Sequence, residues 1–444
     1  IILWVAVTIF VVSSAPKLSE VMKSDQASFL PSSSETSMAS EMVKSLFPDK
    51  GGRSNMVLLA RREGGLTEGD KAYVTKVTDH LDKRGNEYKI REILSPYRKE
   101  ALEKYLISEN KSVALVYFNL TTVPYTDEST ETVSKYMELL KGDLKAPEGL
   151  SVYWTGDAAI GYEEHESVNR SMDITVKVTI FMVLGILLVI YQSPIAAVIP
   201  MITIGISYLI SKGIVGWAAE AGLGVSTFTD TFLIAVLFGA GTDYCLLITS
   251  RYKEELSNGV DPKTALIESM ANTGVAVLSS GGTVIVGFFC MIFAKFGLFN
   301  STGPSVAIGV AITLLAVITL VPALLSVLGK TVFWPKKKLH IKSDNWNDRF
   351  WKTVAERVTM RPIRIILLTF LAIIPFLVMT QYMKISYDQI KDLPLENGSV
   401  MGFEIMKDNF AQGALMPVKV VIKTEKDFWK SENLKTLDEI ADNR

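Results

Sequence analysis

Seven long apolar runs constrain the fold of this 444-residue chain more than any other feature. An α-helix needs about 20 predominantly apolar residues to cross a bilayer, and every run except the first reaches or approaches that length. The sequence therefore predicts an α-helical polytopic membrane protein with one transmembrane helix for each run. We expect the first run to be a truncated transmembrane helix, because it has neither a starting Met nor the basic region of a signal peptide. The runs lie at about 1–14, 174–191, 194–216, 229–250, 274–294, 304–329 and 363–383.

Charge and cysteine content exclude several functional classes. The formal net charge is −1, so the chain lacks the basic surface that a nucleic-acid partner requires. Cys245 and Cys290 both lie in apolar runs, and they indicate neither a disulfide framework nor a metal site. The sequence also lacks a nucleophile elbow and a phosphate-binding loop. We therefore expect no enzyme, no cofactor, no metal and no nucleic-acid partner.

Lysine and arginine residues orient the helices. They are concentrated after the fourth and sixth apolar runs, while the short loops 217–228 and 296–303 contain none. By the positive-inside rule, 251–273 and 330–362 are expected in the cytoplasm, and 15–173 and 384–444 outside. We interpret the run Lys336–Lys338 as part of this topology signal, with binding of anionic lipid headgroups as the alternative.

The polar region 15–173 is predicted to be an extracytoplasmic α/β domain. Thr67, followed three residues later by Asp70, indicates a helix start that is close to a capping box. Alternating strands and helices indicate a small split βαβ module. The predicted strands are 54–60, 112–120 and 149–156, the helices are 66–85 and 127–142, and a further helix runs from about 157 into the second span.

An internal repeat relates two segments that each follow an apolar run. DQASFLPSSSETSMASEMVKSLF, from Asp25, aligns without a gap with DQIKDLPLENGSVMGFEIMKDNF, from Asp388, at an offset of 363 residues. The matches include Asp25/Asp388, Gln26/Gln389, Leu30/Leu393, Pro31/Pro394 and Phe47/Phe410. Residues 1–363 are thus predicted to form one repeat of one span, an outer domain and five spans, and a second repeat starts at 364.

The repeat predicts an order of domains along the chain and a further five-span bundle beyond residue 444. The predicted parts are a truncated first span (1–14), a porter-like α/β domain (15–173), the bundle of spans two to six (174–329), a basic cytoplasmic linker (330–362), the seventh span (363–383) and the start of a second outer domain (384–444).

One acidic residue lies inside the fourth apolar run, in GAGTDYCLLITSRYKEE (239–255). A charged carboxylate at the centre of a bilayer costs about 2.5–3.5 kcal/mol on insertion scales. Burial raises the pKa of a carboxyl group, so such an acid can take up and release protons near neutral pH. Gly239 and Gly241 allow a neighbouring helix to approach, and Thr242 and Tyr244 place hydroxyls beside Asp243.

The stretch GAGTDYCLLITSRYKEEL (239–256) resembles the fourth-helix signature of the MMPL family, within the resistance–nodulation–division (RND) superfamily. VYWTGDAAI (152–160) and SSGGTVIVGF (279–288) are similar to other blocks of that family, and the resemblance covers the whole chain. The outer region of about 160 residues is too short for the docking insert of tripartite drug pumps. The chain is more similar to the YdfJ-like MMPL transporters of Gram-positive bacteria.

The resemblance implies an exporter of lipidic or amphipathic molecules across the cytoplasmic membrane, driven by the proton-motive force. It implies that Asp243 and Tyr244 form a proton relay in the fourth span, with a counterpart pair expected near residue 606. The supporting residues would be Gly239, Gly241, Thr242, Ser279, Ser280 and Thr283. Protons would be the coupling ion, membrane lipids and the substrate would be the partners, and a homo-oligomer is left open.

Each of these interpretations has an alternative. Asp243 could instead make a structural hydrogen bond between helices, and Tyr244 could be a packing aromatic residue. The glycines could serve helix packing alone, and the three hydroxyls of the fifth span could bond their own helix. The run 163–166, which is Glu-Glu-His-Glu, is expected to be a solvated surface and no metal site. The alternative function is a sterol-sensing-like membrane receptor that uses the same bundle.

Overall fold

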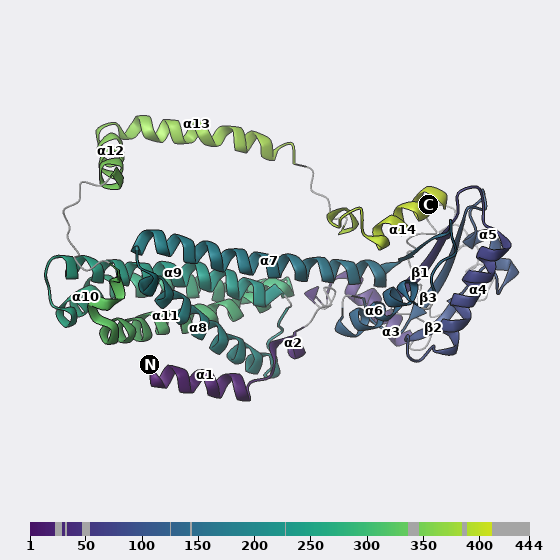
Figure 1. The fold of residues 1–444 in the computed structure, drawn as a ribbon, viewed down its shortest axis with the longest axis horizontal. Helices are drawn as coiled ribbons and strands as arrows, with labels where there is room; N and C mark the ends of the chain where they lie inside the picture. The colour runs from purple at the N-terminus through teal and green to yellow at the C-terminus, as the bar shows by residue number, and fades with distance from the viewer. Residues whose placement is uncertain are drawn as a thin grey trace. The chain divides into compact units, whose positions relative to one another are not determined.

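The computed structural model forms two compact units, here called the membrane unit and the outer unit (Figure 1). The membrane unit consists of Ile1–Ser24 and Glu166–Pro394, and the outer unit of Asp25–His165 and Leu395–Arg444. The structure describes residues 1–22, 29–31, 33–46, 54–124, 126–142, 144–226, 228–335, 346–383 and 389–410. The run Lys336–Lys338 and the repeat positions Asp25, Gln26, Phe47 and Asp388 lie outside these residues.

Six helices of the described residues are long and apolar enough to cross a membrane, which confirms a multi-pass membrane protein. The first apolar run forms a shorter helix, α1 (Ile2–Ser14), and the short α2 (Leu18–Val21) follows it. The six long helices are α7 (Asp157–Tyr191), α8 (Pro194–Glu220), α9 (Phe228–Ser257), α10 (Pro262–Cys290, continued by η3, Met291–Phe293), α11 (Gly297–Leu328, continued by η4, Gly329–Phe333) and α13 (Pro362–Thr380).

Two of these helices begin at a polar N-cap followed by proline. The Ser193 hydroxyl accepts from the N–H of Ala196 before α8, and the Asp261 carboxylate accepts from the N–H of Thr264 before α10. Proline is favoured at the first helical position because its missing N–H would have no partner there. The early start of α10 makes most of the predicted cytoplasmic loop 251–273 helical, because the cap signal precedes the apolar run.

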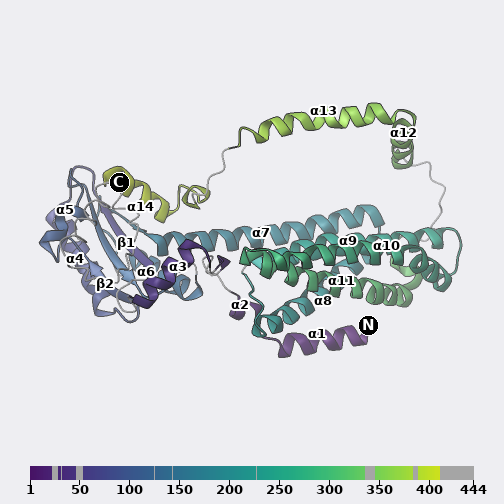
Figure 2. The same cartoon turned by 180° about the vertical axis from the view of Figure 1, so that it is seen from behind.

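The core of the membrane unit is built around α11, which packs against α8, α9 and α10 (Figures 1 and 2). Gly309 of α11 faces Leu233 and Leu237 of α9 so closely that a Cβ atom would clash with them. Gly213 of α8 likewise faces Val11, which lets α1 lie against α8. Small residues thus let backbones approach where lipid supplies no hydrophobic driving force.

The predicted basic linker 330–362 contains a helix that the sequence analysis did not expect. This helix, α12 (Trp346–Met360), is amphipathic and ends directly before α13. Its aromatic residues Phe350 and Trp351 are exposed and lie edge to face, with ring centroids 5.4 Å apart. The helical spacing of the apolar residues in α12 could have predicted this helix. The many Lys and Arg residues of the linker instead indicated a loop.

The outer unit contains a four-stranded sheet in the order β2-β3-β1-β4, and every neighbouring pair is antiparallel. The strands are β1 (Ser54–Arg61), β2 (Ile90–Leu94), β3 (Val113–Leu120) and β4 (Ser151–Thr155). Because β3 lies between β1 and β2, the order is that of a split βαβ module, as predicted. The edge strand β2, whose residues are half-buried or exposed, was not predicted from the sequence.

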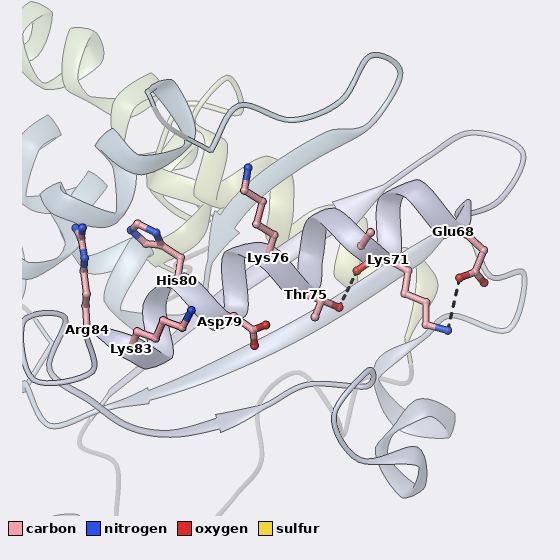
Figure 3. A pocket seen from close by; sticks show the side chains of 9 residues that line it. Glu68, Lys71, Thr75, Lys76, Asp79, His80, Lys83 and Arg84 are labelled. Carbon is pink, nitrogen blue, oxygen red and sulfur yellow. Dashed lines mark hydrogen bonds and ion pairs between the residues drawn. The ribbon is translucent and has the colours of Figure 1, made fainter.

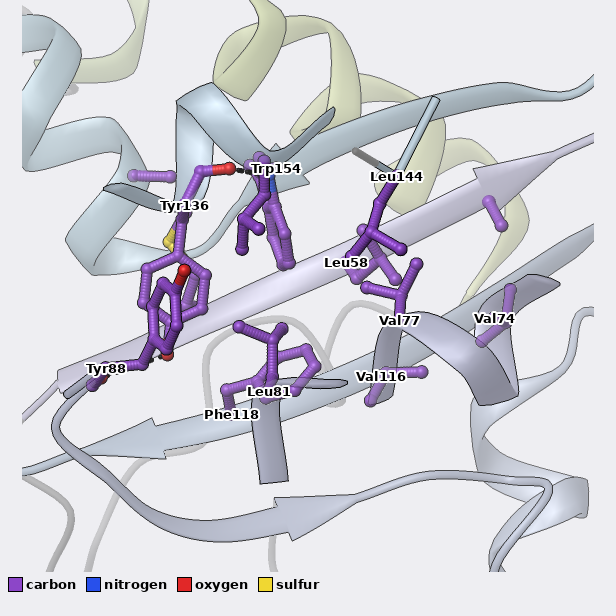
Figure 4. Close-up of a cluster of buried hydrophobic side chains, with 14 of the residues drawn as sticks. Leu58, Val74, Val77, Leu81, Tyr88, Val116, Phe118, Tyr136, Leu144 and Trp154 are labelled. Atoms are coloured by element: carbon purple, nitrogen blue, oxygen red, sulfur yellow. Dashed lines mark hydrogen bonds between the residues drawn. The ribbon is translucent and has the colours of Figure 1, made fainter. Parts of the chain in front are cut away.

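The two faces of this sheet are covered by different helices. One face packs against α4 (Glu68–Lys83) and α6 (Asp127–Lys141), with Leu58, Val77 and Tyr136 in a shared apolar core (Figure 4). The other face is covered by α5 (Glu103–Leu106), which follows the turn η2 (Glu100–Leu102), and by α14 (Gly398–Asn409). The capping box predicted at Thr67 and Asp70 is present at the start of α4.

The sequence repeat has a structural counterpart in two helices. α3 (Glu35–Leu46) and α14 begin and end 363 residues apart, at the offset of the sequence alignment. They differ in packing, because Met406 of α14 is buried against the sheet while the described side chains of α3 are exposed or half-buried. The second copy also begins with a 3-10 turn, η5 (Gln389–Asp392).

Candidate functional site

The candidate site lies halfway along α9, where the helix separates two environments. One stripe of α9 is exposed and runs through Gly239 and Asp243, which are one helical turn apart. The opposite stripe is buried and includes Gly241 and Tyr244. Successive helical residues are rotated by about 100°, so the adjacent pair Asp243 and Tyr244 face different surroundings.

The buried side of α9 is packed against two neighbouring helices. A Cβ atom on Gly241 would lie 2.9 Å from Ile204 of α8 and 3.0 Å from Thr313 of α11. Tyr244 is 4% exposed and belongs to the same apolar cluster as Cys245 and Val317. Gly241 and Tyr244 therefore fix the position of α9 inside the bundle.

The exposed stripe of α9 is open. A Cβ atom on Gly239 would meet no atom within 4 Å. The Asp243 side chain is exposed, and no described residue gives it a hydrogen bond or an ion pair. The structural alternative for Asp243, a hydrogen bond between helices, is thus not made by the described residues.

Two of the predicted supporting hydroxyls, those of Thr242 and Thr283, bond to their own helices. The Thr242 hydroxyl donates to the carbonyl oxygens of Phe238 and Gly239, at 2.6 and 2.9 Å. The Thr283 hydroxyl donates to the carbonyl oxygen of Ser280 at 2.7 Å. Such bonding within a helix is common for Ser and Thr in apolar surroundings. Ser279, Ser280 and Thr283 are all exposed on α10, and none is bonded to Asp243 within the described chain.

A second set of polar groups, not predicted from the sequence, lies between α8 and α9. The Lys212 ammonium lies 3.2 Å from a carboxylate oxygen of Asp230, and the Tyr208 hydroxyl donates to the other oxygen at 2.8 Å. Lys212 also lies over the ring of Tyr208. A lysine and an acid within predicted spans were a visible signal, but their pairing depends on the contact between α8 and α9. The pair neutralises itself, which lowers the cost of charge in the membrane.

In the outer unit, the surface of α4 carries a shallow, open depression (Figure 3). Its lining side chains come from this one helix and include Lys71, Lys76 and His80. An open helix surface with mixed charges lacks the convergent polar groups of a binding site. No group of three or more His, Cys, Asp or Glu side chains among the described residues could hold a metal ion.

One residue of the run 163–166 is more than a solvated surface residue. The Glu163 carboxylate accepts hydrogen bonds from the backbone N–H and the hydroxyl of Ser399. The expectation of a plain surface was therefore wrong for Glu163, because its partner lies 236 residues away in the sequence.

Comparison with known proteins gives the chain clear relatives. A sequence profile of the MMPL family matches residues 28–365. Putative membrane protein YdgH of Bacillus subtilis is 30% identical over 438 residues, which cover 98% of this chain and 47% of the relative. The apo-petrobactin exporter of Bacillus anthracis is 26% identical over 452 residues, covering 95% of this chain and 60% of the relative.

The chain is also similar in sequence to a mycobacterial transport protein. Probable transport protein MmpL12 of Mycobacterium tuberculosis is 27% identical over 430 residues, which cover 96% of this chain and 36% of the relative. The chain spans about half the length of the curated relatives that it matches most strongly.

Proposed function

The chain belongs to the MMPL family, and from this premise we propose that the protein exports lipidic or amphipathic molecules across the cytoplasmic membrane in exchange for protons. The observation that carries the proposal is the position of Asp243, which lies midway along a membrane-spanning helix with no described partner. An ionisable residue at this depth is a functional-site hypothesis by default.

Proton binding offers a physical role for this carboxylate. A protonated carboxyl group is neutral, so uptake of a proton removes most of the cost of holding Asp243 in the membrane. Its release restores a charge that favours a more polar or paired environment. Two states of the bundle that differ in the surroundings of Asp243 would therefore be populated differently with and without the proton.

The neighbouring residues have distinct roles in this proposal. Gly239 leaves space on the exposed stripe, so a partner helix can approach Asp243 closely. The side chain of Tyr244, the residue after Asp243, extends into the core. It therefore links the proton relay to the packing of the bundle. Ser279, Ser280 and Thr283 are available on the exposed side of α10 to bind polar groups that approach with the partner helix.

Export is supported by one relative, which is named as an exporter of apo-petrobactin. The lipidic or amphipathic nature of the substrate rests on the family resemblance. We further propose the domain order described above, with the α/β domains outside the membrane and the α12 segment on the cytoplasmic side.

The proposal is tested with the full-length protein in proteoliposomes that contain trapped pyranine and a fluorescent phospholipid analogue. An imposed pH gradient should drive proton flux and outward movement of the lipid analogue, and Asp243→Asn should abolish both. Glu254→Gln is the matched control and should retain both, since Glu254 is another acid of α9 that is more than half exposed and paired with Arg251.

Lipid movement that persists both in Asp243→Asn and in the presence of a protonophore would show that the protein is not a proton-driven pump. A protein without proton flux that still binds sterol-like lipids would fit the receptor alternative.

A further inference from the structure

The helix α12 of the basic linker carries an exposed apolar face. Phe350, Trp351 and Val358 are 46%, 61% and 42% exposed, and Val354 is half-buried. Phe350, Val354 and Val358 follow one another at intervals of four residues, and Trp351 lies next to Phe350. A helix has 3.6 residues per turn, so these side chains share one face. Large apolar side chains gathered on an exposed face mark a surface that another apolar surface covers.

A helix of this length also depends on such a cover. α12 has 15 residues, and an isolated helix of about that length is marginal in water. Helices in proteins gain most of their stability by packing an apolar face against a neighbour. α12 contacts the adjoining helix α13, yet its aromatic pair stays exposed. Among the described residues, the apolar face of α12 therefore still requires a surface to cover it.

α12 is held close to the membrane by its connection to α13. The helix α13 is one of the six that are long and apolar enough to cross a membrane, and it begins at Pro362, so Arg361 alone separates it from α12. A residue before proline is disfavoured in the helical conformation, and Arg361 has φ −139° and ψ 58°. The two helices therefore meet at a bend (Figures 1 and 2). This bend allows α12 to lie along the membrane surface while α13 crosses the bilayer.

The charge of this segment complements an anionic surface. Residues 346–364 contain five basic and two acidic residues, a net charge of +3. Anionic lipids attract basic residues that lie beside a membrane span, chiefly at the cytoplasmic leaflet. Arg357 is seven residues, or about two turns, from Phe350 and so borders the apolar face. The basic residues are Arg349, Lys352, Arg357, Arg361 and Arg364, and the acidic ones are Asp348 and Glu356.

We propose that α12 lies in the cytoplasmic surface of the membrane and binds the headgroups of anionic phospholipids. Phe350, Trp351 and Val358 insert at the boundary between headgroups and acyl chains, where amphipathic helices place their apolar face. Arg357 and Arg361 bind the lipid phosphates, because their long side chains reach from the apolar face to the headgroups. The inference goes beyond proton-coupled export and uses only the proposed cytoplasmic side of the linker.

Two observations favour lipid over a protein partner as the cover of the aromatic pair. The junction with α13 keeps the C-terminal end of α12 at the membrane surface, whatever else the protein binds. The excess of basic residues matches the charge of anionic lipids.

The first test measures hydrogen exchange by mass spectrometry on the unchanged full-length protein in lipid nanodiscs. One set of nanodiscs contains phosphatidylcholine alone, and the other contains phosphatidylglycerol as roughly a third of the lipid. Exchange in residues 346–360 should be about fivefold or more slower in the anionic nanodiscs, and about 0.5 M salt should remove most of this difference. Equal exchange in the two kinds of nanodisc would overturn the proposal.

Two double variants locate the charges that bind the headgroups. Arg357→Gln with Arg361→Gln should abolish the difference in exchange between the nanodiscs. Lys76→Gln with Lys83→Gln is the matched control, because it removes two exposed charges from α4 in the outer unit. The control should keep the full difference. A control that loses it would refute a local binding site on α12.

A second test identifies what covers the apolar face. The photocrosslinking amino acid p-benzoylphenylalanine replaces either Phe350 or Thr359 of the full-length protein in cells. The two positions are nine residues apart, which places them on opposite faces of α12, and both are exposed. After illumination, mass spectrometry should find phospholipid attached at position 350 and several-fold less at position 359.

The outcomes separate this inference from the proposed function. A protein adduct in place of lipid at position 350, or equal lipid labelling at both positions, would show that α12 does not insert its apolar face. Asp243→Asn should leave exchange and crosslinking unchanged, since neither depends on proton transfer. If α12 fails both tests while Asp243→Asn still abolishes proton flux, the membrane contact of α12 is disproved and the pump is retained.

Discussion

The carboxylate of Glu163, near the start of α7, caps the N-terminus of α14 by accepting hydrogen bonds from the N–H and hydroxyl of Ser399. The N-cap residue of α14, Asn397, makes no side-chain capping bond of its own. The Thr155 hydroxyl donates to the carbonyl oxygen of Ser399 at 2.8 Å. A carboxylate is favourable at this position because the helix dipole is positive there. The first outer domain is thus completed by a helix from the second repeat.

Removing this cap should release α14 from the sheet. Glu163→Ala leaves the N–H and hydroxyl of Ser399 without partners, which costs about 1–3 kcal/mol. Hydrogen exchange measured by mass spectrometry should therefore accelerate in residues 398–409 of the full-length protein. Glu166→Ala, at an exposed position three residues further on, is the control and should leave this exchange unchanged. Equal protection in both variants would contradict the capping role.

Two glycines of α9 should respond differently to the same substitution. Gly241→Val introduces a side chain against Ile204 and Thr313, and such overpacking costs about 1–3 kcal/mol. Gly239→Val points into open space and should leave the thermal unfolding midpoint close to that of the wild type. Proton flux in proteoliposomes should nevertheless be lost in Gly239→Val, because the exposed stripe must receive a partner helix. If the Gly239→Val protein is stable and fully active, the exposed stripe of α9 has no role in the proton relay.

The outer unit should lose stability in acid through Asp70. The bonds from Arg62 lower the pKa of Asp70 from 3.8 to about 2, and bonds from Thr67 act in the same direction. Because the folded-state pKa is the lower one, this stabilisation is present above about pH 4 and is lost as the pH falls towards 2. It amounts to about 2 kcal/mol at neutral pH.

Urea-dependent proteolysis of the outer unit in the full-length protein measures this contribution. Asp70→Asn should lower the free energy of unfolding at pH 7 by about that amount and have a much smaller effect near pH 2. Asp79→Asn is the control, since Asp79 is half exposed and its pair with Arg98 should contribute less. An Asp70→Asn effect that does not change between the two pH values would refute the assignment.

The pair formed by Lys212 and Asp230 should show thermodynamic coupling. Asp230→Asn leaves a lysine charge between α8 and α9 without its partner, so the single variant should be less stable than the double variant with Lys212→Met. A double-mutant cycle on the thermal unfolding of the full-length protein should give a coupling energy of about 0.5–3 kcal/mol. A coupling energy near zero would mean that the two charges are solvated independently.

Much of the architecture could be predicted because it depends on local pattern. Six of the seven apolar runs correspond to the six long helices, since length and composition alone decide whether a helix can span a bilayer. The α/β class of the outer domain followed from the alternation of strands and helices, and Thr67 with Asp70 marked the start of α4. The edge strand β2 was not predicted, because a half-exposed strand shows only weak alternation of apolar and polar residues.

The candidate site was only partly predictable. The position of Asp243 within an apolar run was visible in the sequence, and its depth in α9 follows from it. The role of each neighbour was not visible, because Gly239 and Gly241 look equivalent in sequence yet face open space and two helices, respectively. The pairing of Lys212 with Asp230 also required the contact between α8 and α9.

The sequence by itself determined which segments enter the membrane, the 363-residue repeat and the presence of an acid in the fourth span. Only the tertiary structure decided that Asp243 faces outward while Tyr244 faces the core, and that Glu163 caps α14. The physical reason is the separation along the chain of the residues that decide each property. Hydrophobicity and helix periodicity are properties of neighbouring residues, whereas the surroundings of a side chain depend on contacts between residues far apart in the chain.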